Sequence, residues 1–322
     1  MSAECPEISL IIPAYKAEKY LAACFESITG QSFTDWELIV VDDGSPDDTG
    51  KIADSFALAD SRIRVIHKEN GGVSAARNTG IESARGRYLS FMDADDRLEK
   101  SYLEELYNRA VESNADITQC SFWFEEEDGK KTSDPNGVEA DYKDNTEILN
   151  AYFNGPWGDI RISPWSKLYR RETFKDIRYS TKLRIYEDAF YVYECCRKAK
   201  TAVSFKRPLY DYIQHEQSAT HGRLLEIYPD YFKMYEMQKT DLKDNAHFRR
   251  LIAKREAETA LWLMGIVSRE GKKNELWNLR REVTGIFGDV MFSSAPFLIK
   301  LKTTGVTVMP HIYFAVLAGK KR

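Results

Sequence analysis

Residues 36–43 read WELIVVDD, a short aliphatic run that ends in two carboxylates and leads into the turn residues GSPDDT. Such runs are typical of buried strands in a parallel sheet. The same pattern recurs in ISLIIPAY (8–15), RIRVIHKE (62–69) and YLSFMDAD (88–95). The segments between these runs carry apolar or small residues at helical spacing: AEKYLAACFESITG, DDTGKIADSFALAD and GVSAARNTGIESARG. This alternation predicts an α/β fold, with a Rossmann-like, mostly parallel sheet flanked by helices.

The ends of the four predicted strands are polar, acidic or glycine-rich, and read PAYK, DDGSPDD, KENGG and DADD. Ligands of open α/β sheets bind beyond the carboxyl ends of the strands. The chain has neither G-x-G-x-x-G after the first strand nor G-x-x-x-x-G-K-[ST]. A nucleotide bound here would therefore have to be held without the usual glycine-rich phosphate loops.

The rest of the chain divides by pattern. ADITQCSFWFEEE (115–127) resembles another strand, a polar connection covers 125–145, and TAVSF and PLYDYI indicate short strands further on. From about residue 222 the spacing is mainly helical. We expect an α/β half at 1–115, a second, mixed half at 116–222, and a helical C-terminal region at 223–322.

Composition limits the classes of protein. The 322 residues are 43% hydrophobic, enough for a proper core, and the net charge of -4 gives no reason to expect nucleic-acid binding. The five cysteines lack C-x-x-C spacing, which fits a reducing compartment. The sequence shows no signal peptide and no uncharged apolar run long enough to span a bilayer. These features favour a cytoplasmic protein.

The acids Asp93, Asp95 and Asp96 occupy three of four consecutive positions. Their mutual repulsion indicates that something positive joins them when the protein works. Alternation along a strand would bring Asp93 and Asp95 to one face, where two oxygen ligands suit Mg²⁺ or Mn²⁺ carried in with a nucleotide diphosphate. The alternative is that Asp96 or a neighbouring acid caps the next helix, although capping needs only one acid.

These residues belong to a longer series of motifs: IIPAY (11–15), VVDDGSPDDT (40–49), NGGVSAARNTGI (70–81), FMDADD (91–96), PWSKLYRRETF (164–174) and YEDAFYVYE (186–194). The series resembles that of family 2 glycosyltransferases with the GT-A fold, of the bacterial cell-surface polysaccharide type. The resemblance covers residues 8 to about 220 and implies a GT-A fold for this part. It implies that 1–115 is the nucleotide-sugar-binding half and 116–222 the acceptor and catalytic half. The last hundred residues lie outside it.

The resemblance also implies a donor site. It places Pro13, Ala14 and Tyr15 along the nucleobase and ribose, and Asp42 on the base, commonly a uracil. The alternative for Asp42 is turn chemistry before GSPDDT. For Asp43 we expect an orienting role in that turn.

Further donor contacts follow from the next two motifs. The turn at Asn70 and Gly71 lets backbone approach a ligand, and Arg77 on the following helix would reach the donor. The alternative is a structural turn with a solvated arginine. In FMDADD the resemblance implies that Asp93 and Ala94 contact the ribose or the donor sugar and that Asp95 binds the metal. Asp96 would support them.

The second half of the series implies the catalytic and acceptor residues. Asp188 of YEDAF would be the base that takes the acceptor proton, with Glu187 beside it on the acceptor side. The alternative is helix N-terminal charge. Trp165 and Lys167 resemble acceptor residues, whereas core packing is the alternative for Trp165.

Two histidines follow in DYIQHEQSATHGR (211–223), a segment that resembles one folding over the donor pyrophosphate in the family. His215 or His221 would then be a metal ligand or a phosphate contact, and we select His215 as the metal ligand. The alternative for both is an exposed loop histidine.

The chain ends in SAPFLIKLKTTGVTVMPHIYFAVLAGKKR (294–322), where lysines interrupt apolar runs. This pattern suits peripheral contact with the inner membrane surface. A helix packed on the catalytic domain and a homodimer contact are alternatives.

Together the motifs predict an inverting, metal-dependent hexosyltransferase. It would move a hexose or N-acetylhexosamine from a UDP-sugar to a hydroxyl of a glycan or lipid-linked saccharide acceptor in cell-surface polysaccharide synthesis, with Mn²⁺ or Mg²⁺ as cofactor. One alternative is a nucleotidyltransferase, but PAYKAEKY follows the first strand where that class has a basic, glycine-rich loop. The other is a non-catalytic nucleotide-sugar-binding protein, against which Asp95 and Asp188 argue.

Overall fold

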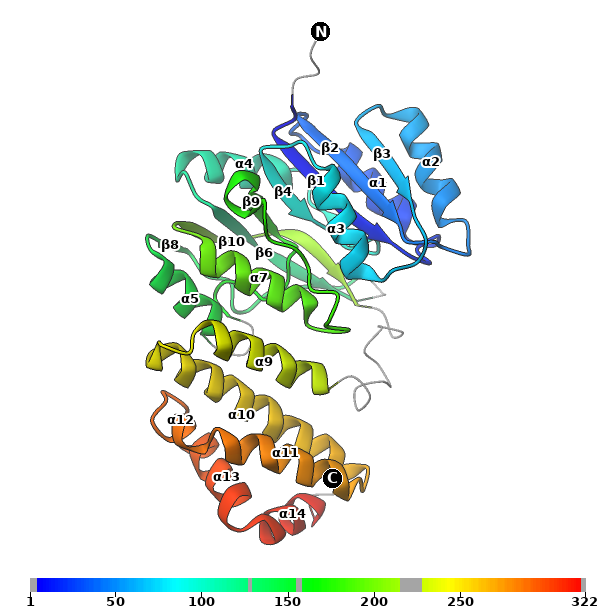
Figure 1. Cartoon of the computed structure of the whole chain (residues 1–322). Helices are drawn as coiled ribbons and strands as arrows, with labels where there is room; N and C mark the ends of the chain where they lie inside the picture. Colours follow the sequence, from blue (N-terminus) through cyan, green and yellow to red (C-terminus); the bar gives the residue numbers. More distant parts are fainter. Residues whose placement is uncertain (1–4, 127–128, 155–157, 215–227, 320–322) are drawn as a thin grey trace. The chain divides into compact units, whose positions relative to one another are not determined.

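The computed structural model describes residues 5–126, 129–154, 158–214 and 228–319. The chain divides into two compact units, Met1–His221 (unit 1) and Gly222–Arg322 (unit 2). In the described residues, unit 1 contains the strands and unit 2 is built from helices (Figure 1).

Unit 1 is organised around one mixed sheet with the strand order β3-β2-β1-β4-β9-β6-β10-β5. The strands are β1 Ile8–Ala14, β2 Trp36–Asp42, β3 Ile63–His67, β4 Tyr88–Phe91, β5 Arg97–Leu98, β6 Ile117–Glu125, β7 Lys131–Ser133, β8 Ala140–Tyr142, β9 Lys167–Arg170 and β10 Ala202–Ile213. The pairs β1–β2, β1–β4, β2–β3 and β6–β10 are parallel, whereas β9 runs antiparallel to both β4 and β6. The four strands predicted from the aliphatic runs are therefore confirmed as one parallel block.

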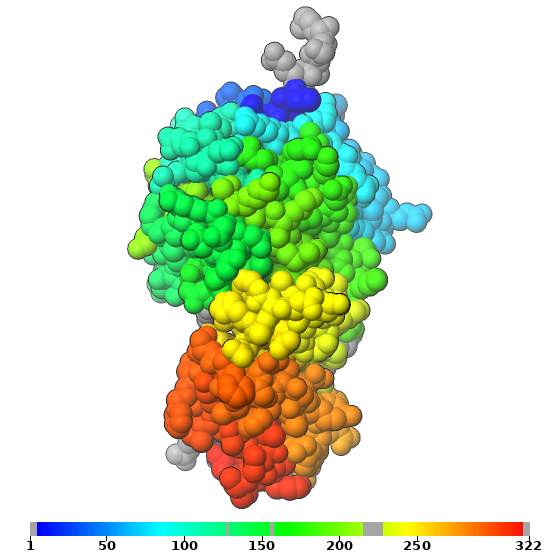
Figure 2. Space-filling view, turned by 60° about the vertical axis from the view of Figure 1, so that its left-hand side comes forward, coloured from blue at the N-terminus to red at the C-terminus, as the bar shows by residue number. Residues whose placement is uncertain are grey.

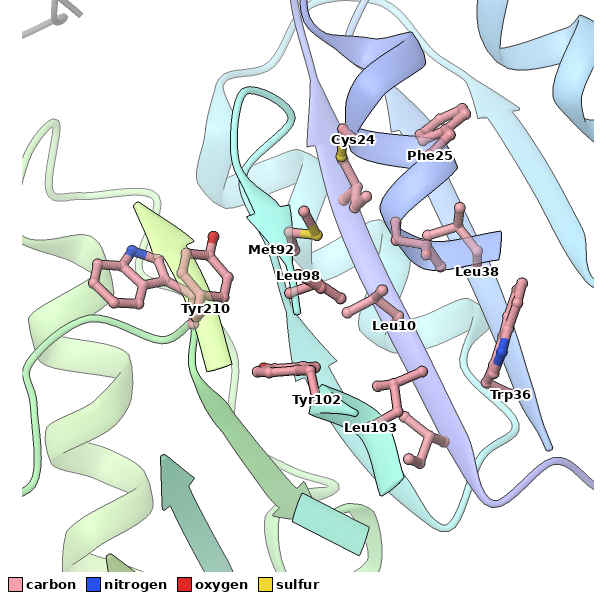
Figure 3. Packing of buried hydrophobic residues seen from close by; sticks show 14 of the residues in the cluster. Leu10, Cys24, Phe25, Trp36, Leu38, Met92, Leu98, Tyr102, Leu103 and Tyr210 are labelled. Carbon is pink, nitrogen blue, oxygen red and sulfur yellow. The ribbon is translucent and has the colours of Figure 1, made fainter. Parts of the chain in front are cut away.

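Helices flank this sheet, and several of them bury a stripe of apolar side chains. Those of unit 1 are α1 Leu21–Thr29, α2 Thr49–Ala59, α3 Val73–Ser83, α4 Tyr102–Glu112, α5 Asn145–Phe153, α6 Arg171–Phe174 and α7 Glu187–Lys198. The buried residues of α1 are Leu21, Cys24, Phe25 and Ile28, which share one face at helical spacing. Figure 3 shows Cys24 and Phe25 beside the β1 and β2 core, close to Leu10 and Leu38.

Helix α3 lies unusually close to β1, and this approach positions a residue of the site. A Cβ atom on Gly80 would stand only 2.3 Å from Cγ2 of Ile11, so only glycine fits there without a shift. Arg77 lies about one turn earlier on the same helix and is buried. The close packing therefore holds the arginine against the edge where the parallel strands end.

The run at 88–95 is shorter as a strand than its sequence predicts. β4 ends at Phe91, and the amide of Asp96 donates to the carbonyl of Asp93 at 3.2 Å in a turn. The expectation that alternation along a strand places Asp93 and Asp95 on one face was therefore wrong. Capping by Asp96 is also excluded, because the cap position of α4 is Ser101.

The two short strands predicted at TAVSF and PLYDYI form one strand, β10. Its register with β6 shifts between Phe205 and Pro208 and again between Pro208 and Tyr210. Proline has no amide hydrogen for the ladder, so it is accommodated by irregular pairing. The shift leaves Tyr210 and Tyr212 near the end of β10, where they enter the site.

Unit 2 is a helical body whose successive segments pack on one another, as the orange and red surfaces of Figure 2 show. Its helices are α9 Pro229–Asp241, α10 Ala246–Arg269, α11 Lys273–Gly285, α12 Phe287–Met291, α13 Phe297–Val308 and α14 Pro310–Gly319. Small buried residues of α10, Ala253 and Ala257, pack against Ile286 and Val290. Among the described residues, no helix combines the length and the apolarity needed to cross a membrane.

Candidate active site

The candidate site lies where the parallel strands of unit 1 end. β1 and β2 end in register at Ala14 and Asp42, and the same edge receives the turn after β4. β9 runs antiparallel to both β4 and β6, and β6 is parallel to β10, so β6 and β10 run in the same direction as β4. The end of β10 at Ile213 therefore reaches this edge as well. The hydroxyl of Tyr210 accepts from the amide of Asp93 at 3.3 Å and links β10 to the turn.

Asp42 is held firmly at the end of β2. Its Oδ1 accepts from the amide of Ser45 at 3.0 Å, and its Oδ2 lies 3.0 Å from Nδ1 of His67. Burial alone would raise the pKa of Asp42, but the hydrogen bonds from Ser45 and His67 bring that pKa below its ordinary value. The carboxylate is thus kept ionised and oriented.

Asp43 organises the turn between β3 and α3. It accepts from the amides of Gly71 and Gly72 at 2.9 and 2.7 Å, and from the ammonium of Lys68 at 2.5 Å. Gly72 has a φ of 86°, a conformation that favours glycine. Asp43 therefore occupies the turn-orienting position that the sequence predicts, and Asn70 and Gly71 are exposed beside it.

The three acids of the turn after β4 have different surroundings. Asp93 accepts from Arg77 at 2.9 Å and is partly exposed, as is Asp95. Asp96 is buried and accepts from the hydroxyl of Tyr210 at 2.5 Å and from the amide of Ile213 at 2.9 Å. Burial, Asp93 and Asp95 all raise the pKa of Asp96. Asp96 therefore fixes the turn to β10, while Asp93 and Asp95 remain accessible to solvent at the edge of the sheet.

Arg77 joins this turn to the start of α7. One terminal nitrogen of its guanidinium binds Asp93, and the other lies 3.1 Å from Glu187. The residue is 5% exposed, and its guanidinium carbon lies 5.1 Å from the centre of the Tyr179 ring. Sequence patterns predicted that Arg77 contacts the donor. The structure shows that it connects two acidic motifs and is buried, so the alternative of a solvated arginine was wrong.

The acidic pair that begins α7 is close to this arginine. Burial raises the pKa of Glu187 to about 7, with a further contribution from Asp188 and opposition from Arg77. The pKa of Asp188 is likewise raised by burial, although Arg77 and the amide of Ala189 oppose the shift. A carboxylate with a raised pKa is a better proton acceptor near neutral pH.

Two of the predicted acceptor residues are corrected by the structure. Trp165 is 9% exposed, and its ring stacks on Tyr210 at 4.8 Å and on Tyr212 at 5.4 Å. Lys167 is 0% exposed, and its ammonium nitrogen donates to the carbonyls of Ser163 and Trp165. Burial lowers the pKa of Lys167 to about 7. Both residues pack the interior beneath the site, so neither presents its side chain to an acceptor.

Other predicted residues remain on the rim or outside the described ranges. Pro13 is half-buried and Ala14 is buried at the end of β1, while Tyr15 is 47% exposed. Ala94 is buried, so only its backbone is placed to meet a ligand. His215 and His221 lie outside the residues that the structure describes.

Two residues of the site were not singled out from the sequence. Tyr210 anchors the acidic turn, and it follows an irregular pairing around Pro208 that the sequence did not reveal. His67 lies beside Asp42. Its position near the end of a predicted strand was the sequence signal that could have identified it as a site residue.

Comparison with known proteins decides the family. The sequence model of "Glycosyl transferase family 2" matches residues 9–178, more than half of the chain. EpsH, a Bacillus subtilis (strain 168) protein named as a glycosyltransferase, is 34% identical over 248 residues, which span 75% of this chain and 71% of EpsH. The chain belongs to glycosyltransferase family 2. The matched region contains Asp42, Arg77 and the acidic turn, while Asp188 lies beyond the end of the family match.

Solved structures show that this glycosyltransferase has the GT-A fold. TarS from S. aureus has a TM-score of 0.72 at 18% identity, covering 98% of this chain and 55% of TarS. TarS 1–349 in complex with UDP-GlcNAc gives 0.71 at 19% identity, covering 97% and 90% of the two chains. A Pyrobaculum calidifontis mannosyltransferase in complex with GDP-Man and Mn²⁺ gives 0.59 at 15% identity, covering 99% and 87%.

Proposed function

We propose that this chain is an inverting, metal-dependent hexosyltransferase. It moves a hexose or N-acetylhexosamine from a UDP-sugar to a hydroxyl of a glycan or lipid-linked saccharide in cell-surface polysaccharide synthesis. The observation that carries the proposal is the pairing of Arg77 with both Asp93 and Glu187, because it joins the donor-side turn to the acid pair of α7. The UDP-GlcNAc bound by TarS supports a UDP-sugar as donor.

The donor is bound along the strand ends. Asp42 accepts a hydrogen bond from the base, and the exposed ring of Tyr15 stacks beside it. The backbone at Asn70 and Gly71 and the carboxylate of Asp93 face the ribose and the sugar. These residues position the donor with its anomeric carbon toward α7.

The acidic turn suits a divalent cation that arrives with the donor. Asp95 would hold Mn²⁺ or Mg²⁺, with the remaining ligands from the diphosphate and water. Such an ion neutralises charge on the departing UDP. Within the described ranges, no group of three or more His, Cys, Asp or Glu residues forms a metal cage. We propose that oxygens of the donor diphosphate complete the site. His215 is proposed as a further ligand.

Asp188 takes the proton from the acceptor hydroxyl as that oxygen attacks the anomeric carbon from the face opposite UDP. A single displacement of this kind inverts the configuration. Burial raises the pKa of Asp188, which strengthens it as a base. Glu187 stays on Arg77 and fixes the start of α7, so the two acids have separate tasks.

Nucleotide sugars with and without metal test this proposal. A UDP-hexose or UDP-N-acetylhexosamine with Mn²⁺ or Mg²⁺ should stabilise the fold by about 2.7 kcal/mol at a hundredfold excess over Kd, measured as a rise in Tm. Slow UDP release should accompany it, and EDTA should remove both effects. Asp95→Asn should also lose the metal effect.

Two other results of this experiment would contradict the proposal. Stabilisation by a nucleoside triphosphate with release of pyrophosphate would indicate a nucleotidyltransferase. Tight UDP-sugar binding without UDP release, even with a panel of acceptors, would indicate a non-catalytic binding protein.

We also propose that α13 and α14 attach unit 2 to the inner membrane surface. They and the segment before them expose eight large apolar side chains: Phe292, Phe297, Leu298, Leu301, Val308, Met309, Ile312 and Val316. Residues 290–322 contain no Asp or Glu but include Lys300, Lys302 and the basic end of the chain. Exposed apolar side chains on a segment whose own charged residues are all basic fit an anionic bilayer. A second copy of the same face would bring like charges together.

Vesicle binding tests this attachment. The protein should sediment with phosphatidylglycerol vesicles more than with phosphatidylcholine vesicles, and less as salt rises. The substitution Leu301→Glu should weaken binding by about tenfold. Leu58→Glu, at a 90% exposed residue of unit 1, is the matched control and should change nothing. Dimerisation without vesicle binding would instead assign this face to a second copy.

A further inference from the structure

His67 connects the proposed base-binding carboxylate to a second acid. It ends β3 and is the register partner of Asp42 in β2. Its Nδ1 lies 3.0 Å from Oδ2 of Asp42, and its Nε2 lies 3.0 Å from Oδ1 of Asp54 on α2. One imidazole therefore spans from a strand end to a helix.

The chemistry of the two partners fixes the charge of this imidazole. An ionised carboxylate can only accept hydrogen bonds, so both ring nitrogens of His67 must donate. A histidine with two N–H groups is the imidazolium cation. In this arrangement His67 therefore carries a positive charge between two negative ones.

The surrounding charges agree with this assignment. β2 contributes Asp42 and α2 contributes Asp54, while the basic residue of α2, Lys51, binds Asp48 at 2.5 Å. Lys68, the residue after His67, binds Asp43. The hydrogen bonds with Asp42 and Asp54 raise the pKa of His67, against a smaller opposing effect of burial.

The start of α2 is built closely around this link. A Cβ atom on Gly50 would lie 2.8 Å from Oδ2 of Asp42 and 3.2 Å from Cε1 of His67. The helix thus leaves room for the imidazole and the carboxylate to meet, but for nothing more. Such packing restricts the orientation of Asp42.

We propose that His67, supported by Asp54, is a positioning residue that holds Asp42 ionised and oriented for a nucleobase that presents an N–H group to it. This inference rests on the proposed function, which places the base at Asp42. It makes donor affinity depend on the charge of His67. A neutral imidazole donates only one hydrogen bond, so Asp42 and Asp54 then compete for it and Asp42 loses its cationic partner.

The sign of the pH dependence follows from this loss. Below the pKa of His67 both hydrogen bonds are present and a base with an N–H donor binds best. As pH rises through that pKa, Asp42 is held less firmly and the affinity for UDP falls. Asp54→Asn removes one of the two negative neighbours, so it should lower the pKa of His67 and shift the fall in affinity to lower pH.

The test compares Kd for UDP with Mn²⁺ between about pH 6 and about pH 9 in the unmodified chain, His67→Gln and Asp54→Asn. At each pH the Kd of a chain is divided by the Kd of His67→Gln. This ratio cancels the titration of UDP itself, and glutamine adds no titration of its own because it cannot be charged. The unmodified chain should bind about tenfold more tightly than His67→Gln at the acid end, and the two should converge at the alkaline end. The Kd of Asp54→Asn should converge with that of His67→Gln at a lower pH than the Kd of the unmodified chain does.

The possible failures are distinguishable. If the unmodified chain binds no UDP at any pH, the proposed function fails. If it binds UDP but the ratio to His67→Gln does not change with pH, the role of His67 is overturned and the proposed function stands. Both substituted side chains are about half exposed, and an unchanged Tm at the alkaline end would show that the variants fold. If His67→Gln were misfolded, an Asp54→Asn pH profile identical to that of the unmodified chain would also overturn the inference.

Discussion

Replacing Asp188 with asparagine is expected to lower the rate of glycosyl transfer by about 10³-fold. Asparagine has the same size but cannot take a proton from the acceptor hydroxyl. The base and ribose contacts proposed at Asp42 and Tyr15 come from other strand ends, so the Kd for UDP should stay within about twofold. The loss should therefore appear in kcat, with binding preserved.

The measurement is single-turnover transfer from a UDP-sugar, with UDP affinity determined in parallel. Asp176→Asn is the matched control, because Asp176 is an exposed acid of unit 1 whose contact with Lys198 is 3.5 Å. It should transfer at the normal rate. The transfer rate of the unmodified enzyme should also rise as pH increases through the raised pKa of Asp188. The Asp188→Asn variant should not show this rise. Full transfer by Asp188→Asn would remove Asp188 from the role of base.

The parallel half of unit 1 was predictable because its signals are local. The aliphatic runs at 36–43 and 62–69 correspond to β2 and β3 within two residues, and the turn residues after them end the strands. Hydrophobic periodicity depends only on which face of an element is buried, so it can be read from a short window. The positions of Asp42 and Asp43 at a strand end followed from the same signal.

The packing beneath the site could not be predicted in this way. Trp165 resembled an acceptor platform because exposed aromatic rings often contact sugars, yet its partners Tyr210 and Tyr212 come from a distant strand with irregular pairing. Lysine is almost never fully buried, so no sequence signal placed Lys167 in the interior. Its ammonium is accommodated because carbonyls of its own loop accept from it.

The ion pairs that Arg77 forms with Asp93 and Glu187 could not be predicted either. The pattern of α3 showed a helix with small buried residues and an arginine, but the partner Glu187 lies 110 positions further along the chain. The sequence therefore identified both acidic motifs as candidate site residues, but it contained no signal that one guanidinium joins them.

Replacing Arg77 with lysine is expected to lower transfer by about 10²-fold. The guanidinium reaches Asp93 with one nitrogen and Glu187 with the other, at 2.9 and 3.1 Å. A lysine ammonium is a single point charge and cannot occupy both positions. One acid would be left without its cation inside a buried site, and the start of α7 would no longer be fixed against the acidic turn.

The structural part of this effect can be separated from the positional one. Arg77→Met removes the charge from a buried network and should cost about 3–5 kcal/mol of unfolding free energy, measured by denaturant titration, whereas Arg77→Lys should cost less. Arg178→Lys is the matched control, since Arg178 is more exposed and its contact with Glu82 is 3.7 Å. It should leave transfer and stability unchanged.

A double-mutant comparison decides whether Arg77 acts through Glu187. If the guanidinium holds α7 in place through that acid, the losses of transfer in Arg77→Lys and Glu187→Gln should be far from additive, because each breaks the same link. Additive losses would mean that the arginine acts on the donor directly, as its sequence position first suggested. Arg77→Lys with normal kcat and only a weaker Kd for UDP would point the same way, because a positioning link between the two motifs must affect the transfer step itself.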